Sequence, residues 1–166
     1  HRDLHSFPTR RSSDLGHAMI EKYYLFSLLT PAQAKLIEKR LLLKLYDKGT
    51  VIFEENDNAD ALYFIQKGKV EVYRMVRDKP SQTMMTLKDG DFFGEVEQID
   101  DSPRIASARA VTDVETLLLL KSDFERIIGD DEEIKHQIYK SFTVEMARRL
   151  RMADDRFKEF FKKALK

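Results

Sequence analysis

The segment Lys88–Ala110, KDGDFFGEVEQIDDSPRIASARA, gathers residue types that could bind a small anionic ligand. Gly94 permits close approach of the backbone, and a short helical turn beginning there would offer free N–H groups to an anion. Nine positions after Glu95 comes Arg104, whose planar guanidinium matches the oxygens of a phosphate. Glu95 is unfavourable beside a phosphate, but a carboxylate accepts hydrogen bonds from sugar hydroxyls. The two side chains together predict a site for a ribose joined to a phosphate.

Strand-like segments separated by turns run from Leu43 to Leu120 and must position these residues. The last two are expected at Arg104–Ala110 and Val111–Leu120. Lys69–Tyr73 alternates polar and apolar side chains with period two, which indicates one solvated face and one packed face. Regular spacing of such short strands is typical of an all-β sandwich or barrel. The fold class expected for the chain is therefore mainly β with flanking α-helices.

Helices are expected on both sides of this β region. Ile20–Leu29 and Pro31–Leu41 have the pattern of short helices, and Thr30 is placed to cap the second one. After the strands, Ser122 is expected to cap a further short helix that ends at Ile128.

The C-terminal segment has an apolar residue every three or four positions over roughly 30 residues, which predicts one amphipathic helix or two in line. The residues of this stripe are Ile134, Ile138, Phe142, Met146, Leu150, Ala153, Phe157 and Phe161. A helix of this length exceeds what a small barrel requires, so part of it is expected to project and meet a partner. Packing entirely on the barrel explains the first half of the stripe equally well. For its charged residues, a solvated face is favoured over a membrane-surface or acidic-partner helix.

The composition excludes several functional classes. The 166 residues include 29 basic and 29 acidic ones, so no net charge attracts nucleic acid. The chain has no cysteine, which rules out disulfides and thiol catalysis and is compatible with the expected cytoplasmic location. Apolar runs such as Leu117–Leu120 are too short to span a bilayer. The four histidines, at positions 1, 5, 17 and 136, lie on no expected strand, so neither a metal-dependent enzyme nor a Ser/His/Asp triad is expected.

Residues 1–18 have no apolar period and are expected to form a disordered or artefactual tail. Residues 19–130 are expected to form the β domain with its entry helices, and residues 131–166 a C-terminal lid or partner helix.

The sequence FGE followed by PR and a run of small residues resembles the signature of the cyclic-nucleotide-binding domain family. This family includes the bacterial catabolite activator and the regulatory subunits of cyclic-AMP-dependent kinase. The resemblance extends from about Leu25 to Met146. It implies a β jelly roll with short N-terminal helices and a long C-terminal helix.

The resemblance also implies a role for each residue of the motif. Glu95, next to Gly94, would accept the ribose 2′-hydroxyl, and Arg104 would pair with the cyclic phosphate. The backbone N–H groups implied to complete the phosphate cradle are those around Val96, Glu97, Ile105 and Ala106. Ser107 stands where the family commonly has Thr or Ser, and a purely structural hydroxyl is an equal alternative.

Two residues bear on which ligand is bound. Ile105 lacks the hydroxyl that guanine-selective sites of the family place after the arginine, which favours cyclic AMP over cyclic GMP. Glu97 stands where the family usually has a small residue. A second carboxylate about 4 Å from a phosphate costs roughly 4 kcal/mol at an effective dielectric constant near 20. Its side chain must therefore point away from the ligand if the site is to bind one.

The resemblance implies a non-catalytic sensor without a cofactor, in which the segment Phe124–Phe142 moves over the bound base. A degenerate, ligand-free domain that acts in interaction or dimerisation is one alternative, favoured by Glu97. A sensor fragment of a transcriptional regulator without its DNA-binding domain is another. The expected partners are a cyclic nucleotide and, through the C-terminal helix, a second copy or an effector protein, with no direct DNA binding by this chain.

Overall fold

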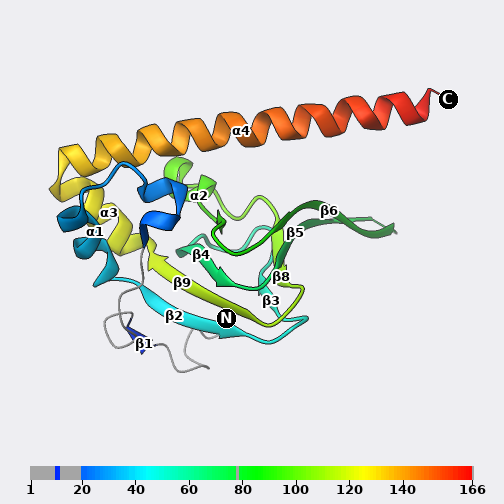
Figure 1. Cartoon of the computed structure of the whole chain (residues 1–166). Coiled ribbons are helices and arrows are strands. Elements are labelled where there is room, and N and C mark those ends of the chain that lie inside the picture. Colours follow the sequence, from blue (N-terminus) through cyan, green and yellow to red (C-terminus); the bar gives the residue numbers. More distant parts are fainter. Residues whose placement is uncertain (1–9, 12–19, 78, 166) are drawn as a thin grey trace.

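The computed structural model describes residues 10–11, 20–77 and 79–165, which form two antiparallel sheets flanked by helices (Figure 1). The first sheet has the strand order β1 (Arg10–Arg11), β2 (Leu42–Tyr46), β9 (Val114–Leu120), β4 (Ala61–Lys67) and β7 (Phe92–Phe93). The second has the order β3 (Val51–Phe53), β8 (Ser107–Ala110), β5 (Val70–Val76) and β6 (Lys79–Leu87). The mainly β fold class expected from the sequence is confirmed.

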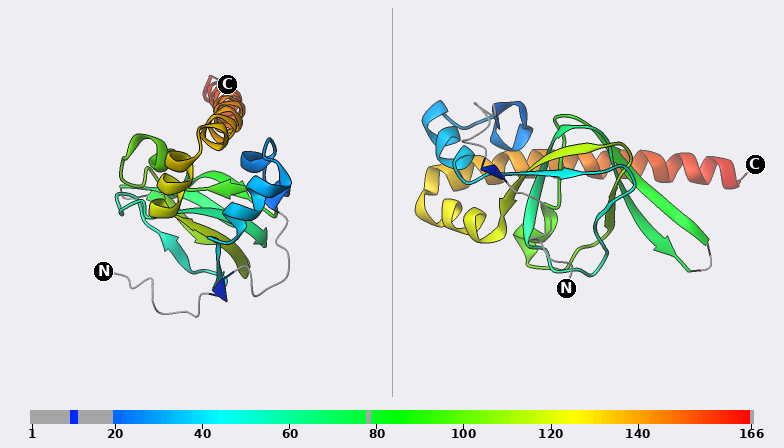
Figure 2. Two further views of the ribbon diagram at one scale, coloured as in Figure 1. Left: turned by 90° about the vertical axis from the view of Figure 1, so that its left-hand side faces the viewer. Right: turned by 90° about the horizontal axis from the view of Figure 1, so that it is seen from below.

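Apart from α2, the helices gather at one end of the sheets, and the last of them, α4, starts there and runs along the whole molecule (Figure 1 and Figure 2). Their bounds are η2 (Ile20–Lys22), η3 (Tyr24–Phe26), α1 (Pro31–Glu38), α2 (Val96–Asp100), α3 (Lys121–Asp130) and α4 (Glu132–Ala164). The predicted first helix is thus two short 3₁₀ turns. The predicted cap of α1 is confirmed, because Thr30 and Gln33 form a reciprocal capping box.

Two predicted details were wrong. Ser122 caps no helix, because α3 already begins at Lys121 and has Leu120 at its N-cap without a side-chain hydrogen bond. The strand expected from Arg104 begins only at Ser107, because the backbone of Arg104 bonds to a loop: its N–H donates to Asp57 O and its O accepts from Asn56 N.

Strand β4 has both of its faces buried, since Ala61–Ile65 are all buried. Tyr63 and Ile65 belong to the core cluster that also contains Val70 and Ala108 of the second sheet. Phe64 lies on the other face, in the cluster that the terminal helices cover. Such a strand reads as a continuous apolar run rather than as an alternating one.

Helix α4 is one continuous helix of 33 residues, and only its first half packs on the domain. Asp131 caps it by accepting a hydrogen bond from Ile134 N at 3.0 Å. Its buried residues, Ile134, Ile138, Ser141 and Glu145, form one stripe toward η3 and α3. Every residue from 151 to 165 is exposed, and Figure 1 shows this part of α4 extending away from the end where α1 and α3 lie, on the side of β5 and β6.

Residues 1–18, which were expected to form a tail, lie outside the described residues except for Arg10 and Arg11. These two pair with Leu43 and Leu42 of β2. The division of the chain at residues 18 and 130 stays a prediction. No helix within the described part of the chain is long and apolar enough to cross a membrane. Within that part, no group of three or more His, Cys, Asp or Glu side chains is arranged to hold a metal ion.

Candidate functional site

The predicted binding motif forms a compact loop between the two sheets. Strand β7 leads into Gly94, helix α2 follows directly, and the chain then returns to β8. Gly94 has φ +74°, and a Cβ at this position would lie only 2.6 Å from Nη1 of Arg104. Glycine is therefore required here both by the backbone angle and by the approach of the arginine.

Arg104 is a buried side chain, with 1 % of its surface exposed. Its Nη1 donates to Gly94 O at 3.0 Å and its Nη2 to Ala61 O at 2.6 Å. The guanidinium carbon also lies 4.2 Å from the ring centroid of Phe53, a cation–π contact. The alternative of a surface arginine paired with an aspartate of the preceding turn is therefore wrong.

The counter-ion of Arg104 is Glu97, which is buried, with 3 % of its surface exposed. One carboxylate oxygen of Glu97 lies 3.3 Å from Arg104 Nη1, and the other accepts a hydrogen bond from Ile105 N at 3.1 Å. The carboxylate of Asp60 is a second neighbour, 3.7 Å from Arg104 Nη2. The sequence left the direction of Glu97 open. In the structure its carboxylate is buried and bonds two of the groups expected to bind phosphate.

Glu95 is also buried and also ion-paired. Its carboxylate accepts a hydrogen bond from Nη1 of Arg149, which lies 54 residues later on α4. Arg149 also donates to Phe92 O at 2.6 Å and to Glu145 at 2.8 Å, so one guanidinium joins α4 to the start of the binding loop.

Burial and charge act in opposite directions on these carboxyl groups. Burial raises the pKa of Glu95, while the positive charge of Arg149 opposes the rise. Burial alone would also raise the pKa of Glu145, but hydrogen bonds from Arg148 and Arg149 outweigh it and lower that pKa. Relative to its ordinary value, the pKa is thus lowered at Glu145 and raised at Glu95.

The remaining residues of the motif lie around Glu95 and Arg104. Val96 begins α2, and Ala106 is buried just before β8. The side chain of Ile105 is exposed, whereas its carbonyl oxygen accepts two hydrogen bonds from Arg74. Ser107 is buried, and its hydroxyl oxygen accepts a hydrogen bond from Glu55 N at 2.9 Å, so the hydroxyl has at least a structural role.

Comparison with known proteins identifies this loop as a family signature. The model of the cyclic nucleotide-binding domain matches residues 43–131, more than half of the chain. This chain belongs to the cyclic nucleotide-binding domain family. It is 35 % identical over 130 residues to the cyclic AMP receptor protein of Thermus thermophilus, across 78 % of this chain and 58 % of that protein. It is also 35 % identical over 129 residues to the cAMP-dependent protein kinase regulatory subunit of Aspergillus fumigatus, across 78 % of this chain and 30 % of that protein.

Solved structures agree with the sequence relatives. The crystal structure of the Thermus thermophilus catabolite activator protein superposes with a TM-score of 0.70 at 32 % identity, covering 82 % of this chain and 62 % of that one. The two sheets with their flanking helices are therefore the β jelly roll of this family. The chain spans less than two thirds of the curated relatives described, so their activities as whole proteins belong to the proposals below.

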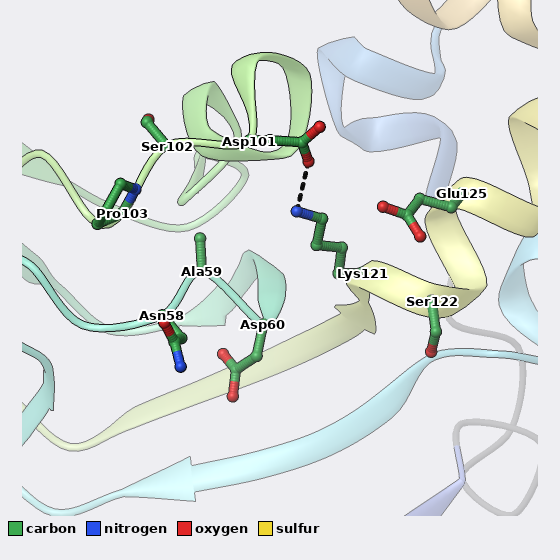
Figure 3. Close-up of a pocket in the computed structure, with 9 residues that line it drawn as sticks. All are labelled: Asn58, Ala59, Asp60, Asp101, Ser102, Pro103, Lys121, Ser122 and Glu125. Carbon is green, nitrogen blue, oxygen red and sulfur yellow. Dashed lines mark hydrogen bonds and ion pairs between the residues drawn. The ribbon is translucent and has the colours of Figure 1, made fainter.

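A surface pocket of about 550 Å³ lies next to the binding loop but does not include Glu95 or Arg104 (Figure 3). The residues that line it are Asn58, Ala59, Asp60, Asp101, Ser102, Pro103, Lys121, Ser122 and Glu125. Three are carboxylates, and the amine of the single lysine already bonds Asp101 at 2.6 Å. This charge distribution disfavours the binding of a phosphate in the pocket.

Sequence reasoning missed Arg149, Glu145 and Asp60 as members of the site. Arg149 stands in the sequence RRLR, where nothing distinguishes it from its basic neighbours. The one available signal was helical spacing, because Glu145 and Arg149 are four residues apart and therefore share a helix face.

Proposed function

We propose that this domain senses cyclic AMP and couples ligand binding to movement of α4. The observation that carries the proposal is the ion pair of Glu95 with Arg149, because it connects the carboxylate assigned to the ribose with the C-terminal helix. The printed names of the Thermus and Aspergillus relatives support cyclic AMP as the ligand. The absence of a side-chain hydroxyl at Ile105 is the reason to prefer it to cyclic GMP.

The role proposed for each residue follows its position in the loop. Glu95, beside Gly94, accepts the ribose 2′-hydroxyl, and Arg104 binds the cyclic phosphate. The backbone N–H groups proposed to complete the cradle are those of Val96, Glu97, Ile105 and Ala106. Ser107 is proposed to line the cradle next to them, in addition to its bond with Glu55 N.

Coupling follows from competition at one carboxylate. A ribose hydroxyl that donates to Glu95 takes hydrogen-bonding capacity which Arg149 now uses, and so weakens the contact between α4 and the loop. A ligand shifts such an equilibrium only by its difference in affinity for the two states. The proposed output is therefore a change in the position of α4, with no reaction catalysed, in a cytoplasmic protein.

Ligand binding is tested by titration calorimetry and thermal unfolding with cyclic AMP and cyclic GMP. At a ligand concentration of 100 Kd, binding stabilises the folded state by about 2.7 kcal/mol. For a chain of this size, that corresponds to a rise in Tm of roughly 5–10 °C. Arg104→Lys should weaken cyclic AMP binding at least tenfold, because lysine lacks the planar fork, whereas Arg151→Lys on exposed α4 should not. A folded protein with no heat and no shift at millimolar cyclic AMP would instead support the ligand-free interaction domain.

Movement of α4 is tested with spin labels. The chain has no cysteine, so the pair Lys48→Cys and Arg156→Cys can be labelled selectively at exposed positions, one on the β domain and one on α4. Cyclic AMP should change the distribution of distances between these labels. The control pair, Lys48→Cys and Lys88→Cys, lies outside α4 and should not change. An unchanged first pair with saturating ligand would contradict the coupling.

We further propose that the exposed half of α4 pairs with a second copy of the chain. Large apolar side chains are exposed along it, with exposed fractions of 72 % for Leu150, 62 % for Phe157 and 64 % for Phe160. With Ala153 and Ala164 they follow a 3,4,3,4 spacing, which is the seam of a coiled coil. An effector protein on the same stripe is the other possible occupant.

Analytical ultracentrifugation tests self-association. The wild-type chain should sediment as a dimer, and the double variant Leu150→Glu/Phe157→Glu as a monomer, because two copies would bury carboxylates in the seam. Arg151→Glu/Lys158→Glu changes charge off the seam and should leave the dimer intact. A wild-type monomer at high micromolar concentration would favour an effector protein as the occupant. A sensor fragment of a longer regulator is compatible with either result, since the Thermus relative extends beyond the matched region.

A further inference from the structure

The two oxygens of the Glu97 carboxylate occupy the donors that the proposed function assigns to the ligand phosphate. One oxygen lies 3.3 Å from Arg104 Nη1, and the other accepts from Ile105 N at 3.1 Å. A carboxylate and a phosphate offer the same pattern to such donors, namely two oxygens that share a negative charge. Glu97 is a constituent of the cradle rather than a neighbour of it.

The charge balance around Arg104 leaves no place for a further anion. The side chain of Arg104 is fully buried, and that of Glu97 is 4 % exposed. The carboxylate of Asp60 lies 3.7 Å from Nη2, and this second carboxylate is 42 % exposed. A phosphate added beside these groups would bring a third negative charge to one buried cation, and like charges at this distance repel strongly where water is excluded.

We propose that Glu97 is a tethered competitor of the ligand phosphate and sets the affinity of the site for phosphate-bearing ligands. This inference rests on the proposed function. The carboxylate holds the anion position of the cradle, and it has to leave Arg104 and Ile105 N before a cyclic phosphate can bind them. Binding is thus an exchange of one anion for another, and the affinity for phosphate is the difference between two similar interactions.

A ligand without the phosphate provides the matched comparison. Adenosine carries the same base and ribose as cyclic AMP but no anion, so Glu97 should not oppose it. Glu97→Gln removes the charge and keeps an oxygen that can accept from Ile105 N, whereas Glu97→Ala leaves Arg104 without its counter-ion and is the harsher change. Glu132→Gln removes the same charge at a position where the side chain is 85 % exposed, on the first turn of α4.

The experiment measures the Kd of cyclic AMP and of adenosine by calorimetry for the full chain and for these variants, each checked for folding by circular dichroism. We expect Glu97→Gln to bind cyclic AMP at least tenfold more tightly than wild type, with the Kd of adenosine changed less than twofold. Glu132→Gln should change neither constant.

Three results would overturn the inference, and they separate it from the proposed function. Equal cyclic AMP affinity of wild type and folded Glu97→Gln would mean that Glu97 does not compete, while the sensor function stands. An equal gain for adenosine and cyclic AMP would mean that the substitution acts on the loop as a whole. Absence of cyclic AMP binding to wild type and to folded Glu97→Gln alike would remove the sensor function together with the inference.

Discussion

Replacing Arg149 with Met should destabilise the protein by about 3 kcal/mol, the lower end of the range for removing one partner of a buried ion pair. Methionine keeps much of the packing volume and removes the charge. Arg149 is 13 % exposed, and its partner Glu95 only 4 %, so the substitution leaves a buried carboxylate without its cation. The lower end applies because Arg149 is partly solvated and because Glu145 keeps its hydrogen bonds with Arg148.

Urea unfolding of Arg149→Met, Glu95→Gln and the double variant measures how the two side chains interact. Each single variant removes one ionised partner, whereas the double variant removes both. The double variant should therefore be less destabilised than the sum of the single variants, by about 2 kcal/mol. In thermal unfolding, Arg149→Met should lower the Tm by roughly 6–12 °C, given 2–4 °C per kcal/mol for a domain of this size.

Arg151→Met is the matched control, since Arg151 is exposed two residues further along the same helix. It should change the free energy of unfolding by less than about 0.5 kcal/mol. If Arg149→Met is no more destabilising than this control, the contact between α4 and the binding loop contributes nothing to stability. The reasoning that connects α4 to Glu95 would then be refuted.

Three other substitutions test further parts of the structure. Gly94→Ala should abolish the loop geometry and lower the Tm, because a Cβ would lie 2.6 Å from Arg104 Nη1, whereas Gly129→Ala, with nothing within 4 Å of its Cβ, should be tolerated. Phe64→Ala should cost about 3–5 kcal/mol in urea unfolding, since this fully buried ring packs 5.0 Å from Tyr23 and 4.9 Å from Phe26 between ring centroids. Glu145→Gln should reduce the loss of stability on acidification, because the pKa of Glu145 is lowered in the folded state. The contribution of this carboxylate to stability is therefore present above its ordinary pKa of 4.5 and disappears as the pH falls through the folded-state pKa. Unfolding free energies between pH 3 and 7 that fall equally in the variant and in wild type would contradict this assignment.

The sequence alone was sufficient to predict features that depend on residues close to one another along the chain. The N-cap at Thr30 and the long helix predicted from the apolar stripe of α4 depend on local patterns, and both were confirmed. The proximity of Gly94 and Arg104 was also predictable, because a family signature of eleven residues encodes one loop.

Features that depend on long-range packing were not predictable. The partner of Glu95 comes from α4, and which residue it is depends on where that helix crosses β7. The sequence of residues 145–152 does not indicate the position of this crossing. The direction of Glu97 could not be predicted for a similar reason. It depends on the burial of Arg104, because a buried arginine needs a counter-ion, and Glu97 is the acidic side chain within reach that is itself shielded from water.

Under the proposed function, the two buried ion pairs of the binding loop together determine the affinity for the ligand. Each signature side chain already has an intramolecular partner of opposite charge, Arg149 for Glu95 and Glu97 for Arg104. A cyclic nucleotide presents a hydroxyl donor to the first and an anion to the second, so a single ligand competes with both partners. Its observed affinity is then the difference between the new contacts and the two ion pairs it displaces. Because Arg149 belongs to α4, the energy spent in displacing it is also the energy by which the ligand can move the helix. A variant that weakens this ion pair should therefore bind nucleotide more tightly and at the same time move α4 less on binding.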